Sequence, residues 1–443
     1  MRLVIENVAK VRNADIKLNG LTVIAGENSS GKSTVGKILF STVRALADAR
    51  DDDANRRMRV INKHVTSLYT RLRGIVRRYE NKDINDLFPL LKSTFTRTLI
   101  EAEETNVFDD YYAKLKETIQ NLEEATPRLK ALIQRDLENI AINIRNKDNR
   151  AATFKTMMEY SIESEFMNSI CSYGYDHASV KLFMENDNGR EYLNLQILNE
   201  EVASVEMGSG KPLADATYVE SPLYLHMLDT LLNADTFREG SSRILRRSML
   251  PVHIKDLAEK IDALRLSSSA PLLFDHLQIQ DIIDGEFHFD KKKRILSFQQ
   301  KGNEISPINV ASGIKSFGLI QMLLETNTID ADKILIWDEP ENHLHPRWQI
   351  LFAKLLVQLS KMGIPVLIST HSPYFVQGVR FFAAQLDVEA FVNYYLAEER
   401  DDNLSELREV TDDLNAIFVK LSKPLNDIMN VDLVRMKKES NND

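Results

Sequence analysis

The stretch "LTVIAGENSSGKST", residues 21–34, joins a short apolar run to a loop of small and polar residues. Residues 21–25 are nearly all apolar and β-branched, which predicts a strand covered on both faces. Residues 26–33 then match the order G-x-x-x-x-G-K-[ST] of a phosphate-binding loop. Apolar residues at helical spacing follow, so a helix is expected to begin directly after the loop.

Each residue type in this loop has a chemical reason. Glycines let the backbone curl so that successive N–H groups point at phosphate oxygens. Lys32 can place a positive charge on the β- and γ-phosphates, and the Ser33 hydroxyl can ligate Mg²⁺. The cofactors expected are therefore ATP and Mg²⁺. The residues expected to bind the nucleotide are Gly26, Glu27, Asn28, Ser29, Ser30, Gly31, Lys32, Ser33 and Thr34.

A second segment, "KILIWDEPENHLHP" (residues 333–346), supplies the acids that such a loop needs. Its apolar start predicts a buried strand with Asp338 at its C-terminal end, where ligands of open α/β sheets gather. Asp338, together with Ser33, is expected to position the metal. Glu339, one position further, is expected to polarise the attacking water as a general base.

A third segment, "IPVLISTHSPYF" (residues 364–375), predicts another buried strand, which ends at His371. A histidine at that edge can reach the γ-phosphate as a donor and sensor. Each segment alone has an ordinary structural alternative, but three such groups at the ends of separate strands favour a common site. The expected catalytic residues are Glu339, His371 and Lys32.

These motifs resemble those of ABC-type ATPases, in the branch that contains RecF, Rad50, SMC heads and OLD-like proteins. Residues 26–34 are similar to the Walker A motif, residues 338–340 to Walker B, and His371 to the switch histidine. "DEPENHLHP" and "STHSPYF" are especially similar to OLD-like ATPases of bacterial antiphage operons, including the ATPase subunit of Septu and its retron-associated relatives. The resemblance implies an α/β fold, a P-loop head of the ABC type with a mixed sheet flanked by helices.

"NVASGIKSFGLIQMLLE" (residues 309–325) stands where that family has its serine/glycine signature. By resemblance, Ser312, Gly313 and Lys315 would bind the γ-phosphate held by a second subunit, which implies a homodimer or higher oligomer of heads. Ala311 departs from the pattern, because a serine is usual there. Either Ser312 takes over the contact or this half of the site is weaker. A simple helix N-cap is the alternative reading of the segment.

Two further positions carry open interpretations. His343 and His345 lie two apart, which allows a metal-site reading, but no third ligand is evident. They fall where the family has its dimer-contacting loop, with His345 near the usual aspartate. Glu220 or Ser221 stands near the expected position of the family's Q-loop, without a firm alignment.

Between the two halves of the nucleotide motif lies a long insertion. Apolar stripes run from Tyr112 to Leu122 and from Leu129 to Ile144, and Pro127 interrupts them. Such short runs favour a helical bundle over a coiled-coil arm, and residues 179–210 alternate like an antiparallel meander. The expected organisation is head residues 1–45, an inserted helical domain 46–170, a head β meander 171–221, a helical subdomain 222–285 and the remaining head 286–443.

Composition limits the function classes. With 56 basic and 65 acidic residues the net charge is −9, which argues against coating nucleic acid through bulk charge. A local nucleic-acid contact stays open, for example at the basic tip of residues 291–294. The single cysteine, Cys171, suits the reducing cytosol. A cytoplasmic protein without membrane contact is expected, because the sequence shows neither a signal peptide nor a run of about 18 apolar residues.

The resemblance to OLD-like ATPases implies an ATPase whose nucleotide-dependent dimerisation regulates a separate effector, a nuclease or toxin, in antiphage defence. The stretch after His371 is short for the Toprim nuclease domain of OLD nucleases, so no built-in nuclease is expected. Two alternatives stay open: a DNA-binding repair ATPase like RecF, and a scaffold that binds ATP and scarcely turns it over. The departure at Ala311 favours slow turnover.

Overall fold

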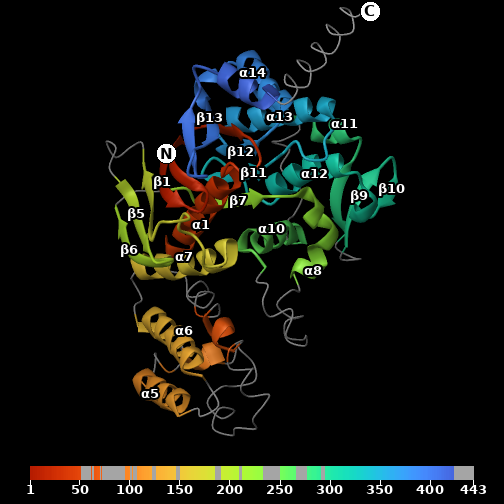
Figure 1. The fold of residues 1–443 in the computed structure, drawn as a ribbon. Helices are drawn as coiled ribbons and strands as arrows, with labels where there is room; N and C mark the ends of the chain where they lie inside the picture. Colours follow the sequence, from red (N-terminus) through yellow and green to blue (C-terminus); the bar gives the residue numbers. More distant parts are fainter. Residues whose placement is uncertain are drawn as a thin grey trace, which may run out of the picture. The chain divides into compact units, whose positions relative to one another are not determined.

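The chain forms two compact units, Met1–Arg44 with Tyr160–Asp443 (unit 1) and Ala45–Glu159 (unit 2). Unit 2 lies almost wholly within the insertion expected at residues 46–170. A computed structural model (Figure 1) describes residues 1–50, 61, 64–69, 71, 95–99, 102, 107–121, 126–145, 150–184, 191–208, 212–232, 250–265, 277–290 and 295–423.

The centre of unit 1 is one large sheet. Among the described residues it has 11 strands, in the order β6-β5-β4-β1-β2-β14-β13-β3-β12-β11-β7. These strands are β1 (Arg2–Val8), β2 (Val11–Lys17), β3 (Leu21–Gly26), β4 (His177–Phe183), β5 (Glu191–Leu198), β6 (Glu201–Met207), β7 (Asp215–Val219), β11 (Lys333–Asp338), β12 (Val366–Thr370), β13 (Val392–Glu399) and β14 (Ser405–Glu409).

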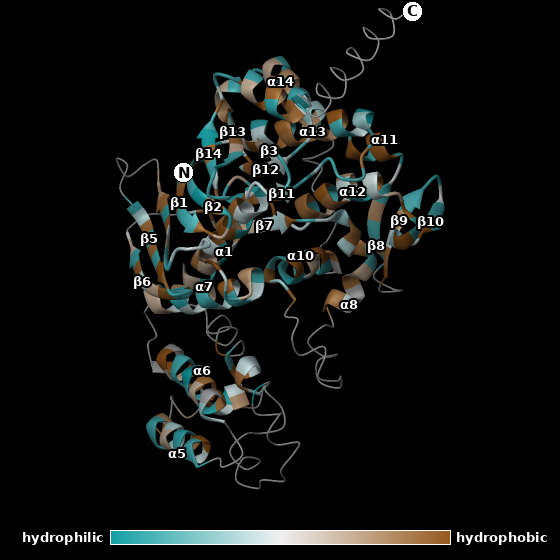
Figure 2. Ribbon diagram, viewed as in Figure 1, coloured by the Kyte–Doolittle hydropathy of each residue, from teal (hydrophilic) through white to brown (hydrophobic). Residues whose placement is uncertain are grey.

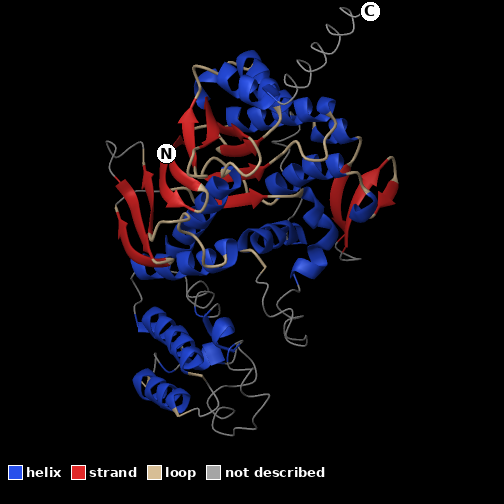
Figure 3. Cartoon of the chain, in the orientation of Figure 1, coloured by secondary structure: helices blue, strands red, loops and turns tan. Residues whose placement is uncertain are grey.

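The sheet has an antiparallel half and a parallel half. Strands β6, β5, β4, β1 and β2 pair antiparallel, and β4 to β6 form the meander that the alternating residues 179–210 predicted. Strands β13, β3, β12, β11 and β7 pair parallel. Figure 3 shows helices flanking this mixed sheet, so the expected α/β class with a β meander is confirmed.

Helices α1 (Lys32–Arg50) and α13 (Pro346–Lys361) cover opposite faces of the parallel half. On one face, a Cβ on Gly36 of α1 would lie 3.1 Å from Ile336 Cγ2 of β11. On the other, Trp337 of β11 packs against Phe352 of α13, with 4.9 Å between ring centroids. Because both faces are covered, β3 and β12 are buried at every position.

The other helices of unit 1 complete the core. In Figure 2, hydrophobic residues gather along α12, whose side chains belong to the main hydrophobic cluster. Both α13 and α14 begin with a proline, which is favoured at the first helical position. These helices are α7 (Arg150–Phe166), of which residues 160–166 belong to unit 1, η2 (Pro222–Met227), α8 (Leu228–Leu232), α10 (Val252–Asp262), η3 (Ala263–Arg265), α11 (Ile279–Ile283), η5 (Pro307–Asn309), α12 (Ser312–Glu325), α14 (Pro373–Gln385) and η6 (Glu389–Phe391).

A second, small sheet precedes α12. It consists of β8 (Glu286–Asp290), β9 (Ile295–Gln300) and β10 (Asn303–Ile305), paired antiparallel in the order β10-β9-β8. The basic residues 291–294 considered for a nucleic-acid contact stand between β8 and β9 in sequence and lie outside the described residues. Near the C-terminus, residues 415–423 are helical.

The described elements of unit 2 are helical. The apolar stripes expected around Pro127 form α5 (Phe108–Gln120) and α6 (Pro127–Arg145), and Pro127 is the first residue of α6. Side chains such as Leu115, Leu137 and Ile144 are buried in a cluster of their own. Among the described residues of both units, no helix has the length and apolar character needed to span a bilayer.

Candidate nucleotide-binding site

The phosphate loop, residues 26–34, leaves the end of β3 and enters α1 as expected. Lys32 is the first residue of α1 and is only 4% exposed. Its Nζ donates to the carbonyl oxygens of Gly26 at 3.0 Å and Glu27 at 2.7 Å, so the lysine folds over the loop. Burial lowers the pKa of Lys32, and the nearby carboxylates, of which Glu339 and Asp338 act most strongly, oppose that shift.

The loop has the shape and the donors that a phosphate group requires. Ser29 and Gly31 have positive φ angles of 62° and 81°, and a Cβ on Gly31 would lie 2.9 Å from Val11 Cγ2. Ser30 is 3% exposed, and its hydroxyl has no hydrogen-bond partner among the described residues. A buried hydroxyl without a partner is uncommon, and a phosphate oxygen would satisfy it. The loop therefore fits the phosphates of ATP.

Asp338 ends β11, beside the end of β12, and is 8% exposed. Two buried hydroxyls hold its carboxylate: Tyr218 donates to Oδ2 at 3.0 Å, and Ser369 contacts Oδ1. Ser33 lies in the first turn of α1. Hydroxyl and carboxylate oxygens are the ligands that Mg²⁺ takes, so the donor set of Ser33 and Asp338 fits this metal.

Glu339 and His371, from separate strands, lie together as predicted. The distance from His371 Nδ1 to Glu339 Oε1 is 3.4 Å. Glu339 has a φ of 47°, a conformation uncommon for a residue with a side chain, and its N–H donates to the Ser369 carbonyl at 2.9 Å. Asn342 donates to Glu339 Oε2 at 2.9 Å. The carboxylate is thus held in one orientation at the carboxyl edge of the sheet.

Glu341 is a functional residue that the motif reading missed. It is 4% exposed, and its Oε1 accepts from the Thr370 hydroxyl at 2.6 Å and from the N–H groups of His371 at 2.7 Å and Ser372 at 3.1 Å. Burial raises the pKa of Glu341. This carboxylate ties the turn after β11 to the end of β12, and its only sequence signal was a third acid in "DEPEN".

A buried cluster around His253 was also missed. His253 Nδ1 lies 2.6 Å from Glu165 Oε2 and its Nε2 lies 3.0 Å from Glu220 Oε2, while Tyr224 donates to the same Glu220 oxygen at 2.7 Å. The hydrogen bond with His253 is the main cause that lowers the pKa of Glu220 to about 2. Burial alone lowers the pKa of His253, but the bonds to Glu165 and Glu220 outweigh it and raise the pKa.

Glu220 directly follows β7, the strand next to β11. Ser221, the other position considered for the Q-loop, is the N-cap of η2 and accepts from the Leu223 N–H at 3.2 Å. The ends of four adjacent parallel strands therefore carry polar groups of the site or its surroundings: β3 the phosphate loop, β12 His371, β11 Asp338 and β7 Glu220.

Residues 312–325 of the signature segment form α12, and residues 309–311 lead into it. Ala311 is the N-cap and provides no side-chain hydrogen bond, so the departure seen in the sequence falls on the cap itself. Ser312 Oγ lies 3.5 Å from the His343 carbonyl, and a Cβ on Gly313 would contact Leu344 at 3.1 Å. The start of α12 therefore packs against the loop that follows β11.

Lys315, expected to add a positive charge to this segment, is instead 1% exposed and contacts the ring of His226. Burial lowers its pKa. The reason is helical geometry: Lys315, the fourth residue of α12, points toward η2, with which α12 is in contact. In this arrangement the charge of Lys315 is not presented at the open start of the helix.

His343 and His345 do not support the metal reading. No group of three or more metal-binding side chains occurs in the described part of the chain. His345 is the N-cap of α13, and its Nδ1 accepts from the Arg347 N–H at 3.3 Å. His343 has a φ of 63° and forms the turn before it. The structure therefore gives His345 a capping role.

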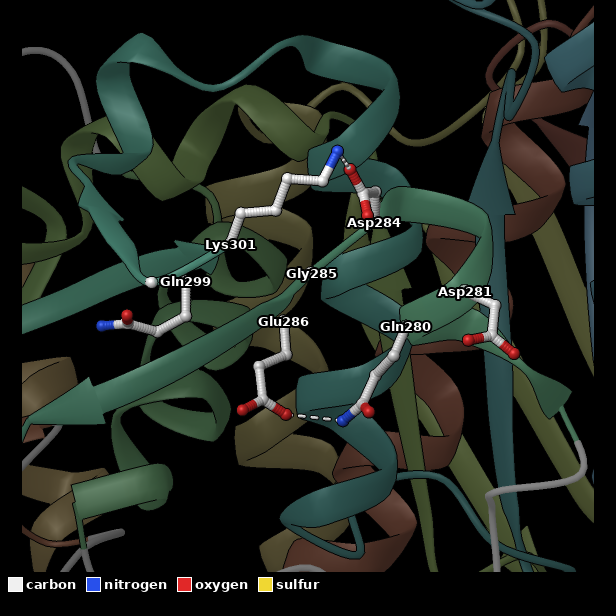
Figure 4. Close-up of a pocket in the computed structure, with 8 residues that line it drawn as sticks. Gln280, Asp281, Asp284, Gly285, Glu286, Gln299 and Lys301 are labelled. Atoms are coloured by element: carbon white, nitrogen blue, oxygen red, sulfur yellow. Dashed lines mark hydrogen bonds and ion pairs between the residues drawn. The ribbon is translucent and has the colours of Figure 1, made fainter.

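An open polar pocket lies beside α11 and the small sheet, as Figure 4 shows. Four of its polar side chains form two pairs: Lys301 pairs with Asp284 at 2.7 Å, and Gln280 donates to Glu286 at 2.5 Å. Because these groups satisfy each other, we assign no ligand to the pocket.

Comparison with known proteins gives one family match, to "AAA domain, putative AbiEii toxin, Type IV TA system", over residues 226–377. This range contains the signature segment, Asp338, Glu339 and His371, whereas the phosphate loop lies outside it. No curated protein matches the chain. The phosphate loop is therefore identified by its own motif and geometry, and the remaining site residues fall within the matched range.

Solved structures of SMC heads are among the proteins that align with the chain. The SMC head domain from Thermotoga maritima aligns with a TM-score of 0.36 and 10% identity, over 92% of this chain and 98% of that one. An Smc head bound to the C-winged helix domain of ScpA gives 0.37 and 11%, over 92% and 96%. An Smc head with an extended coiled coil, bound to the C-terminal domain of ScpA from Pyrococcus furiosus, gives 0.37 and 9%, over 97% and 98%. Scores and identities this low do not define a shared function.

Proposed function

We propose that the chain binds ATP with Mg²⁺ at the phosphate loop and hydrolyses it. One observation carries this proposal: a buried lysine at a phosphate-binding loop, a held pair of acids and a histidine converge on one edge of the sheet. They come from the ends of β3, β11 and β12, which are neighbours in the sheet although far apart in sequence. That is the edge at which open α/β sheets bind ligands.

The residues divide the chemistry among them. Lys32 leaves the loop carbonyls and pairs with the β- and γ-phosphates, while Ser30 donates its hydroxyl to a phosphate oxygen. Ser33 and Asp338 would hold Mg²⁺, which would neutralise negative charge on the phosphates during transfer of the γ-phosphoryl group to water. Glu339, oriented by Asn342, accepts a proton from the attacking water, and His371 donates toward the γ-phosphate.

The proposed cycle includes two heads. The start of α12 has unsatisfied N–H groups and a cap without a side-chain oxygen, which is an arrangement suited to an anion from another molecule. In a face-to-face pair, Ser312 and Gly313 of each head would contact the γ-phosphate bound by the other. Nucleotide would then stabilise the pair, and hydrolysis would release it.

The output we propose is control of a separate effector, a nuclease or toxin, in antiphage defence. Two observations support it: the similarity of "DEPENHLHP" and "STHSPYF" to OLD-like ATPases, and a family match whose description names a putative toxin of a type IV system. Copurification of the chain with the products of adjacent genes, with and without ATP, tests this part. An effector that binds equally in both states would contradict nucleotide control.

Two variants test the ATPase itself. Lys32→Ala should lose ATP binding, whereas Glu339→Gln should keep binding and lose hydrolysis by about 10²–10⁴-fold, the range for a general base. Glu389→Gln, which changes an exposed carboxylate of η6, is the matched control and should behave like wild type. Normal ATP affinity in Lys32→Ala would contradict the site assignment.

The same measurements separate the ATPase from a nucleotide-bound scaffold. The capping residue Ala311 favours slow turnover, so the wild type is measured under single-turnover conditions as well. A scaffold would bind ATP and release no phosphate, and Glu339→Gln would then equal wild type. ATP-stimulated, salt-dependent binding to bare DNA would instead favour a repair ATPase.

A further inference from the structure

Tyr218 is a fully buried tyrosine whose hydroxyl donates to Asp338 Oδ2 at 3.0 Å. The contact follows from strand register. Tyr218 of β7 lies opposite Ile336 of β11, and Asp338 lies two residues further along the same face. A tyrosine at this position can therefore reach diagonally across to the carboxylate, which a shorter side chain could not do.

The ring of Tyr218 is enclosed on several sides. A Cβ on Gly36 of α1 would lie 2.8 Å from Tyr218 Cε2, so the helix that follows the phosphate loop rests directly on the ring. Phe40 of the same helix meets it edge-on, with 6.2 Å between centroids. His253 packs against it at 4.8 Å and is itself held between Glu165 and Glu220. These contacts hold the Tyr218 ring in the orientation that directs its hydroxyl to Asp338.

Tyr218 thus contacts both halves of the candidate site, α1 by packing and β11 by a hydrogen bond. Carboxylates that hold metals are usually oriented by outer hydrogen-bond partners, and loss of such a partner typically costs 10–100-fold in metal affinity or activity. Each oxygen of a carboxylate has two lone pairs, so an oxygen that accepts one hydroxyl can still bind a metal. Tyr218 and Ser369 occupy one lone pair on each oxygen of Asp338.

We propose that Tyr218 is a positioning residue that sets the metal affinity of the site by fixing Asp338. The inference rests on the proposed function, because it concerns Mg²⁺ bound together with nucleotide. Tyr218 touches neither metal nor nucleotide itself and acts through Asp338. Its loss therefore weakens metal binding while leaving the binding of metal-free nucleotide to the phosphate loop unchanged.

The test is Tyr218→Phe, which removes one oxygen and keeps the ring. The control is Tyr395→Phe. Tyr395 lies on β13, is also fully buried, and its hydroxyl accepts from the Lys17 N–H at 2.9 Å. Both variants lose one hydrogen bond made by a fully buried tyrosine, so both should lose some stability. A purely structural effect would be the same in both.

The readout is binding rather than turnover. Mn²⁺ binding is measured by electron paramagnetic resonance in the presence of ADP, and ADP binding is measured separately in EDTA. We expect Tyr218→Phe to weaken Mn²⁺ binding about 10-fold or more and to leave ADP binding in EDTA within about 2-fold of wild type. Ser369→Ala, which frees the other oxygen of Asp338, should give the same signature, and Tyr395→Phe should change neither value.

The outcomes separate the two hypotheses. Mn²⁺ affinity in Tyr218→Phe equal to wild type would overturn the positioning role, as would an equal loss of metal and metal-free nucleotide binding. Failure of the wild type to bind ADP or ATP would instead contradict the proposed function, and with it this inference. Lys32→Ala completes the comparison, since it should lose nucleotide binding in EDTA where Tyr218→Phe keeps it.

Discussion

The buried His253 cluster predicts an unusual pH dependence of stability. Both ring nitrogens face carboxylates, which favours the doubly protonated imidazole, because Glu165 and Glu220 offset its charge. The groups around the ring are these two acids, Tyr218 of β7 and Phe40 of α1. The His253 side chain is 1% exposed, so solvent does little to screen the pairing. The perturbation is His253→Gln, which keeps a donor but removes the charge.

The expected magnitude has two parts. Removing one partner of a buried ion pair costs about 3–5 kcal/mol. The pKa of His253 is raised above its ordinary value of 6.5 in the fold. Its stabilisation is therefore complete below pH 6.5 and is lost as the pH rises through the folded-state pKa. Between pH 6.5, the ordinary pKa of an unfolded histidine, and the raised pKa of His253 in the fold, the wild-type free energy of unfolding should fall with rising pH. The expected slope is about 1.4 kcal/mol per pH unit relative to His253→Gln.

The assay is urea unfolding at pH values from 6 to 9. The two tryptophans, Trp337 and Trp348, both belong to unit 1, so their fluorescence reports the unfolding of the unit that contains the cluster. His288→Gln is the control, because His288 is exposed on β8. If the unfolding free energies of wild type and His253→Gln run parallel with pH, His253 is not a cation in the folded protein and the reasoning fails.

Three further predictions concern the site. Ala311→Ser adds a side-chain cap to α12, which should stabilise the protein by about 0.5–2 kcal/mol and should also speed ATP hydrolysis. Ala311→Asp is the control, because it should give the gain in stability without the faster hydrolysis. Equal turnover of ATP in the two variants would contradict a signature role for this position. Glu341→Ala leaves three donors unpaired, at about 1–3 kcal/mol each, whereas Glu341→Gln keeps an acceptor. The alanine variant should therefore unfold at much lower urea, and similar midpoints for the two would contradict the hydrogen bonds described. Gly36→Ala gains about 1 kcal/mol of helix propensity but places a Cβ 2.8 Å from Tyr218, and such overpacking costs about 1–3 kcal/mol. We expect net destabilisation and weaker ATP binding, while Gly378→Ala, whose nearest contact would be 3.1 Å, should be close to neutral in an equilibrium unfolding assay.

The local motifs were readable because their chemistry depends on neighbours in sequence. Residues 26–34 carry the loop, its lysine and its hydroxyls within one turn, so their spacing alone indicates a phosphate site. Apolar runs likewise predicted the strands that end at Asp338 and near His371. The placement of these groups at one sheet edge followed from a general rule of parallel sheets, which the structure meets.

Other features depend on segments that the sequence separates widely. Tyr218 and Asp338 are 120 positions apart, and Glu165, Glu220 and His253 come from α7, the end of β7 and α10. Their pairing depends on strand register and on which helix covers which face, and neither is encoded in a local pattern. Lys315 shows the same limit, because its charge is sequestered by a neighbouring element.

The phosphate loop, the two acids and the histidine at strand ends were predictable from the amino-acid sequence, because they are local patterns of residue type and spacing. How those groups are held could be seen only in the folded chain, because hydrogen bonds and burial arise from packing between distant segments. The carboxylate of Asp338 illustrates the difference. Its place at a strand end was predicted from "ILIWDE", whereas its two hydroxyl partners were identified only from the structure, in which β7, β11 and β12 lie side by side.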